Sequence, residues 1–193
     1  MKVWKKSLAV MLAGLTMFAG VPFTASAAEH TATAAEVEAV RSGASAAYQW
    51  ENDGLHWKLL YLNQKAMQWQ YAAKQWVQIG GRFYHFNADG EMEEGWFEDE
   101  GMWYFAQYDS KDRSNTSAGV VLTGWASIPD PHGTNHTFYF GAAENGRPNG
   151  MYCGEGEYYK SYTIDGSSRS FDGNGYCSNA PYDSIPSYSN GRV

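Results

Sequence analysis

The chain has 193 residues and a formal net charge of −7, and 16% of its residues are aromatic, including eight tryptophans. An acidic chain lacks the basic surface that nucleic acids require, so this composition argues against a nucleic-acid partner. The length of the chain suggests one domain. Because large aliphatic residues are sparse, we expect its core to be built from aromatic rings.

Residues 1–27 have the features of a secretory signal peptide. Three lysines precede an apolar run over residues 8–23, and the small residues Ala25-Ser26-Ala27 follow it. A membrane anchor is the alternative, but the run is shorter than the roughly 20 residues of a spanning helix and contains Gly and Pro. We therefore predict cleavage after Ala27. The product is a secreted chain with a net charge of −10 and no membrane span.

The following segment, residues 28–47, is rich in Ala, Glu and Thr and has few large apolar side chains. Residues 35–41 are compatible with a turn or two of helix, but the composition is more typical of a flexible N-terminal segment.

The stretch from Trp76 to Phe105 contains the same short unit twice. Three aromatic residues recur twenty positions later, Trp76 as Trp96, Phe83 as Trp103 and Tyr84 as Tyr104. In each unit, two aromatic runs flank a Gly-containing turn, which is the pattern of a β-hairpin. Because a lone hairpin is marginally stable in water, such units must stack to bury their rings. The sequence therefore predicts an all-β protein of stacked β-hairpin repeats, similar to a solenoid.

Less regular units flank this pair. Trp50 and Trp57 are seven residues apart around an Asn-Asp-Gly turn, and Gly124-Trp125 begins a later unit whose second ring is Phe138. The link between the first two units is about six residues longer than the regular one, and a short helix over 64–74 or a different register through Trp69 also suits it. We place the repeats at residues 48–150.

The last segment, residues 151–193, contains both cysteines, Cys153 and Cys177. Disulfides persist in exported proteins, and this one would close a loop of about 25 residues and stabilise it by roughly 3 kcal/mol. Free thiols, a metal pair or a nucleophilic cysteine are the alternatives. We predict a small disulfide-closed hairpin followed by a loose tail.

The run WVQIGGRFYHFNADGEMEEGW, followed by GMWYF, resembles the cell-wall-binding repeat of Gram-positive bacteria, also called the choline-binding or glucan-binding repeat. Partial matches at Trp50 and Trp125 extend the resemblance to about residues 48–150. The resemblance implies hairpins that wind into a solenoid. It also implies aromatic pockets between hairpins for choline groups on teichoic acids, or for glucans and other saccharides.

Carried onto this sequence, the resemblance implies two ligand pockets. One would use Trp76, Phe83 and Trp96, with Met92 at its base; the second would use Trp96, Trp103 and Trp125. The face of an aromatic ring attracts a quaternary ammonium group, and the same flat face stacks on a sugar. Phe83 stands where the family has Trp, and Phe is the weaker partner for a cation.

Other residue types suggest no catalytic, metal or cofactor site. His132 and His136 have a spacing that suits a metal on a helix, but Pro131 and Gly133 favour a loop. The acidic cluster over residues 91–100 is interpreted as a solvated rim, or as a surface that attracts cationic groups. A pair of carboxylates for glycoside hydrolysis cannot be chosen from sequence, and the C-terminal segment is too short for an ordinary catalytic domain.

The sequence therefore predicts a secreted, non-enzymatic protein that is attached to the cell wall through choline or polysaccharide groups. The first alternative is a secreted carbohydrate-binding module for host or dietary glycans. The second is a small wall-acting hydrolase that uses the Cys-containing segment.

Overall fold

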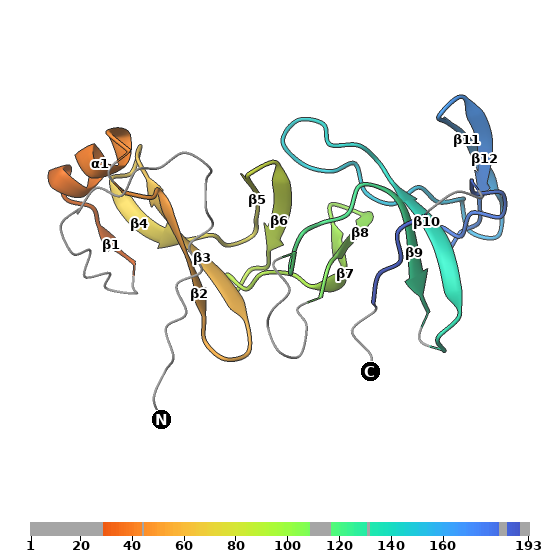
Figure 1. Ribbon diagram of the computed structural model, residues 1–193, viewed down its shortest axis with the longest axis horizontal. Coiled ribbons are helices and arrows are strands. Elements are labelled where there is room, and N and C mark those ends of the chain that lie inside the picture. Colours follow the sequence, from red (N-terminus) through yellow and green to blue (C-terminus); the bar gives the residue numbers. More distant parts are fainter. Residues whose placement is uncertain (1–28, 44, 109–116, 131, 182–184, 190–193) are drawn as a thin grey trace. The chain divides into compact units, whose positions relative to one another are not determined.

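The computed structural model describes residues 29–43, 45–108, 117–130, 132–181 and 185–189. The predicted signal peptide lies outside these residues. The chain divides into two compact units. The first comprises the residues up to Gln75 together with Phe86–Met92, and the second comprises Trp76–His85 and the residues from Glu93 onward. Figure 1 labels their helix and strands.

The first unit contains a four-stranded antiparallel sheet of order β1-β4-β3-β2. Its strands are β1 (His30–Thr31), β2 (Tyr48–Asn52), β3 (Trp57–Asn63) and β4 (Gln68–Tyr71). The predicted Trp50–Trp57 hairpin is present as β2–β3, and the two indoles meet edge to face at 6.5 Å. The link that also suited a helix is instead the strand β4, which contributes the buried Trp69 to the core.

The N-terminal segment differs from the flexible prediction, because residues Ala34–Arg41 form the helix α1. A capping box starts the helix: the Thr33 hydroxyl accepts the Glu36 N–H, and the Glu36 carboxylate accepts the Thr33 N–H. Val37 is 3% exposed and packs with Leu60, Leu62 and Trp69. Contact with the sheet therefore stabilises a helix that is too short to be stable alone.

The second unit is a series of antiparallel hairpins joined by irregular links. They are β5 (Gln75–Ile79) with β6 (Arg82–Phe86), β7 (Gly95–Asp99) with β8 (Met102–Ala106), β9 (Gly124–Pro129) with β10 (Asn135–Phe140), and β11 (Lys160–Ile164) with β12 (Ser167–Phe171). The tight turn of β5–β6 needs positive φ at Gly80 and Gly81, which glycine adopts without strain. The prediction of a chain built mostly from β-hairpins is confirmed in the described residues, where α1 is the one helix.

One backbone hydrogen bond recurs along the chain. After each hairpin, a residue of the following link forms a β-bridge with the last residue of the hairpin, as Val121 does with Ala106, Met151 with Phe140 and Cys177 with Phe171. We call these link residues exit residues. Each exit residue also donates its N–H to a carbonyl of the preceding hairpin: Val121 to Phe83, Met151 to Trp103 and Cys177 to Thr137, at 2.8–2.9 Å. Within the first unit, Met92 bridges Phe86 and donates to Trp57 in the same way.

This repeated bond identifies equivalent positions in different hairpins. The acceptors Phe83, Trp103 and Thr137 each lie three residues before the end of their strand. Thr137 therefore occupies in β10 the position that Trp103 occupies in β8. The aromatic spacing in the sequence suggests Phe138, one residue later, because the loop of β9–β10 is longer than the other hairpin turns. By the same rule β11–β12 is a further hairpin of the series, with Ser168 at this position.

The predicted disulfide is not formed, because Cys153 and Cys177 are both free, half-buried thiols. Backbone hydrogen bonds close this segment instead. Gly154 donates its N–H to Asp172 at 2.7 Å, and the Tyr162 hydroxyl donates to the Cys153 carbonyl at 2.9 Å. Cys177 serves as an exit residue and is held against β10 through its own N–H. The two cysteines thus have separate backbone anchors, and the hairpin forms without a covalent link.

The predicted loose tail is partly ordered. Ser187 forms a parallel bridge with Ser127 of β9, and Tyr188 packs against the core cluster that contains Phe105 and Ile128. No helix in the described ranges has both the length and the apolar character needed to cross a membrane.

Candidate functional site at the hairpin junctions

The hairpins of the second unit pack on one another through aromatic rings. We call the contact between β5–β6 and β7–β8 the first junction, that between β7–β8 and β9–β10 the second, and that between β9–β10 and β11–β12 the third. Since successive side chains of a strand point to opposite faces, each hairpin offers one face to each neighbour. Five of the six residues predicted from the sequence to bind ligand lie on these faces. The sixth, Met92, does not.

At the first junction, Trp76 of β5 lies against the buried rings of the next hairpin. Its ring centroid is 4.8 Å from that of Tyr104 and 5.8 Å from that of Phe97. Phe83 packs on the same cluster and remains half-buried. The predicted partner Trp96 is not part of this cluster; it is adjacent to Phe97 in β7 and therefore faces the other way.

Hydrogen bonds fix the orientation of the Trp76 indole. Its Nε1–H donates to Asp99 Oδ2 at 2.8 Å, and the Arg147 guanidinium donates to the same oxygen at 3.3 Å. The other Asp99 oxygen lies 3.8 Å from His85 Nε2. Asp99 therefore holds one indole and one guanidinium, which keeps the ring of Trp76 in a single orientation at the junction.

His85 lies inside this junction. Its imidazole stacks on Phe97 at 5.1 Å with an interplanar angle of 7° and lies 4.9 Å from the Trp76 ring. Burial lowers the pKa of His85, and the charge of Asp99 only partly opposes this effect. His85 is consequently neutral near pH 7.

At the second junction, Trp96 and Trp103 lie on the same face of β7–β8, as the register of the hairpin shows. Trp96 contacts Phe138 of the next hairpin at 5.0 Å and Phe105 of its own at 5.2 Å. Trp103 is 46% exposed, which makes it the most accessible tryptophan of this junction.

Trp125, the predicted third ring, is not at the second junction. In β9 it pairs with Tyr139, whereas the neighbouring Ala126 pairs with Phe138 and packs in the cluster that contacts Trp96. Trp125 thus faces the third junction, where it stacks on Phe171 at 6.1 Å. Met92 belongs to the first unit, is 7% exposed, and bridges Phe86.

The residues that sequence reasoning missed are Tyr104 and Phe138, the rings that face Trp76 and Trp96 across each junction. Strand alternation provides the signal for both. Trp96 faces the next hairpin, so the adjacent residue Phe97 must face the opposite way, toward Trp76. Tyr104 is paired with Phe97 across the hairpin and therefore faces Trp76 as well.

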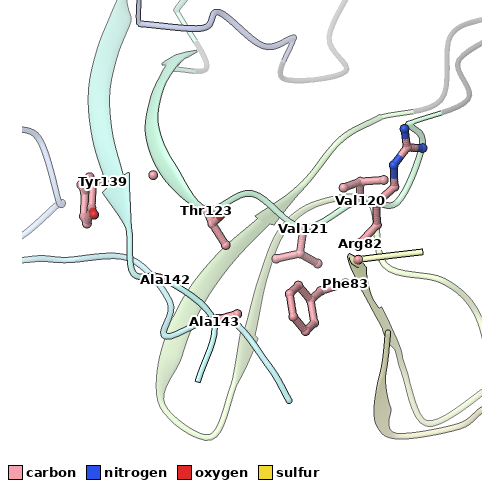
Figure 2. A pocket seen from close by; sticks show the side chains of 10 residues that line it. Arg82, Phe83, Val120, Val121, Thr123, Tyr139, Ala142 and Ala143 are labelled. Carbon is pink, nitrogen blue, oxygen red and sulfur yellow. The ribbon is translucent and has the colours of Figure 1, made fainter. Parts of the chain in front are cut away.

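A cavity of about 390 Å³ lies beside Phe83. Figure 2 shows Phe83 and Val121 on one side of it and Tyr139 on the other, with Ala142 and Ala143 between them. Its volume is within the range of small-molecule sites, and its walls combine two rings with the hydroxyls of Thr123 and Tyr139. Across the described residues, no group of three or more His, Cys, Asp or Glu side chains comes together as metal ligands do.

Comparison with known proteins identifies the class of the repeat. Residues 74–92 match the family model described as "Putative cell wall binding repeat". The chain therefore contains a cell-wall-binding repeat, and the resemblance predicted from the sequence is confirmed in this stretch, which includes Trp76, Phe83 and Met92. Among curated proteins, none matches the chain significantly.

Several solved structures are similar to parts of the chain. An alternansucrase in complex with isomaltononaose has 18% identity and a TM-score of 0.37, over 66% of this chain and 8% of the alternansucrase. The modular Cpl-1 endolysin complexed with a peptidoglycan analogue has 16% identity and a TM-score of 0.35, over 72% of this chain and 41% of the endolysin. Choline binding protein F from Streptococcus pneumoniae has 20% identity and a TM-score of 0.29, over 72% and 44%. TM-scores this low do not establish a common overall fold, and the chain spans less than half of each protein.

Proposed function

We propose that the chain is a secreted binding protein that attaches to a cell-wall polymer through the aromatic rings of its first and second junctions. The observation that carries the proposal is the match of residues 74–92 to a cell-wall-binding repeat, in a hairpin whose Trp76 and Phe83 lie at a junction. The ligand groups that suit these rings are a quaternary ammonium, such as choline, or the apolar face of a sugar.

The second junction is the more accessible of the two. Trp103 exposes almost half of its surface, and Glu98 lies directly opposite it in the register of β7–β8. Residues directly opposite on one face of a hairpin have adjacent side chains. An indole face beside a carboxylate favours a cationic group, because both attract positive charge. The cavity beside Phe83 and Tyr139, which contains hydroxyl groups, suits a saccharide unit of the same polymer.

This role is one of binding, and no reaction is assigned to the chain. A carbohydrate-binding role toward other glycans rests on the same rings, and the ligand experiment below separates it from wall attachment.

The test is a sedimentation assay of the full mature chain on purified choline-containing walls. We expect free choline to release the bound protein and Trp103→Ala to weaken binding about 2- to 30-fold, the loss that corresponds to one ring–cation contact of 0.5–2 kcal/mol. Tyr158→Ala is the matched control, since Tyr158 is an exposed ring away from these junctions in sequence, at 80% exposure. Equal losses for the two variants would refute the site. Binding that choline does not reverse, but that soluble glycan does, would replace the cation with a sugar.

A further inference from the structure

The third junction differs from the other two at two equivalent positions, each of which carries a ring in the other junctions. At the first junction Tyr104, two residues before the end of β8, faces Trp76 at 4.8 Å. At the second, Phe138, two residues before the end of β10, faces Trp96 at 5.0 Å. The corresponding residue of β12 is Arg169, and its guanidinium carbon lies 5.8 Å from the centre of the Trp125 ring.

A second ring is also missing from the third junction. The position of Phe83 and Trp103 is occupied in β10 by Thr137, as the recurring hydrogen bond shows. The third junction therefore presents one tryptophan, Trp125, with a positively charged side chain of the same protein over it.

The Arg169 side chain is fixed in this place. Its Nη1 donates to the carbonyl of Asn179, and its Nε is buried. The indole Nε1 of Trp125 is buried too. A second cation of the same hairpin also lies over a ring. Lys160 Nζ is 5.6 Å from the ring centre of Tyr162, the residue paired with Arg169. Both cations thus lie over aromatic rings of β9–β12.

We propose that Arg169 is a specificity-determining residue that occupies the cation position on Trp125 and closes the third junction to cationic ligands. The inference rests on the proposed function, in which the preceding junctions bind a cationic group. An incoming quaternary ammonium gains a ring contact only if it displaces the guanidinium, and it meets like charge as it approaches. Cationic ligands are consequently excluded from the third junction.

The experiment rebuilds the missing ring with and without the internal cation. Thr137→Trp restores the ring found at Trp103, and the double variant Thr137→Trp/Arg169→Tyr also restores the ring found at Tyr104. Choline chloride is titrated into each full mature chain by isothermal calorimetry. We expect no additional site in Thr137→Trp and one additional choline site per chain in the double variant. Thr137→Trp/Arg169→Lys is the matched control; it keeps the positive charge and should remain closed.

Two results would overturn the inference: an additional site in Thr137→Trp alone, or no additional site in a double variant that is folded by far-ultraviolet circular dichroism. If the double variant does not fold, Thr137→Trp/Arg169→Ala, which removes the cation and adds no bulk, decides between the same two results. A wild-type chain that binds no choline would count against the proposed function. The inference about Arg169 would still be decided, because it depends only on whether the double variant gains a choline site that Thr137→Trp lacks.

Discussion

The two tryptophans of the β7–β8 hairpin should separate stability from binding. Trp96 contacts three rings, Phe105, Phe138 and Phe140, at 5.0–5.9 Å, and all three are at most 5% exposed. Trp96→Ala therefore removes an indole from the core. Replacing a buried large aromatic residue by Ala costs about 3–5 kcal/mol, and because Trp96 is only partly buried we expect about 3 kcal/mol. Trp103, at 46% exposure, should cost about 1 kcal/mol or less.

The assay is equilibrium unfolding in urea, followed by far-ultraviolet circular dichroism, for wild type and the two variants. Both changes remove the same side chain from the same hairpin, so each variant is the control for the other. We expect Trp96→Ala to lower the free energy of unfolding by at least 1.5 kcal/mol more than Trp103→Ala does, roughly half of the expected core cost. Similar losses for both would mean that Trp96 is not a core residue and that the assignment of faces is incorrect.

Three further changes test other parts of the structure. Burial lowers the pKa of His85, so the folded state binds this proton less readily than the unfolded state; the stability that neutral His85 contributes is complete above the ordinary value of 6.5 and is lost as the pH falls below it. His85→Phe should flatten the decline in unfolding free energy as the pH falls below about 6.5, and an unchanged slope would exclude His85 as its source. Gly95→Ala should destabilise by about 2 kcal/mol or more in thermal unfolding, because its φ is +76° and a Cβ would lie 1.9 Å from the Tyr108 hydroxyl; wild-type stability would contradict that contact. Thr33→Ala should cost about 1 kcal/mol through loss of the cap that receives the Glu36 N–H, measured by urea unfolding, and no loss would show that α1 does not depend on it.

Much of the hairpin architecture could be predicted from the sequence, because it depends on local patterns. The recurrence of Trp76 as Trp96 and of Phe83 as Trp103 places each ring on a strand, and Gly80-Gly81 fixes the turn between strands. Such features need no knowledge of distant contacts.

The composition of each junction could not be predicted in the same way. Spacing places Trp96 near Trp76, but alternation turns it toward the following hairpin and leaves Tyr104 to face Trp76. In β10 a longer loop moves Thr137 into the place expected for Phe138, a shift of one residue that exchanges the two faces of a strand.

Tertiary contacts explain the remaining differences. Residues 34–41 have modest helical tendency alone, and the contact of Val37 with the sheet holds them in a helix. Cysteine content suggested a covalent closure of the last segment, but the Cys177 N–H is bound to Thr137 in the position of an exit residue, and this register holds the hairpin without a disulfide.

The recurring hydrogen bond also determines how the series of hairpins ends. In β12 the carbonyl of Ser168 is the one that a further hairpin would use, and the side-chain amide of Asn179 already donates to it at 3.0 Å. The same side chain accepts the Ser170 N–H at 2.8 Å, so one asparagine makes the backbone hydrogen bonds that an adjacent strand would otherwise make. Repeat arrays need such a cap to protect their last unit, and a longer array made by duplicating hairpins would have to place the copies before Asn179 rather than after it.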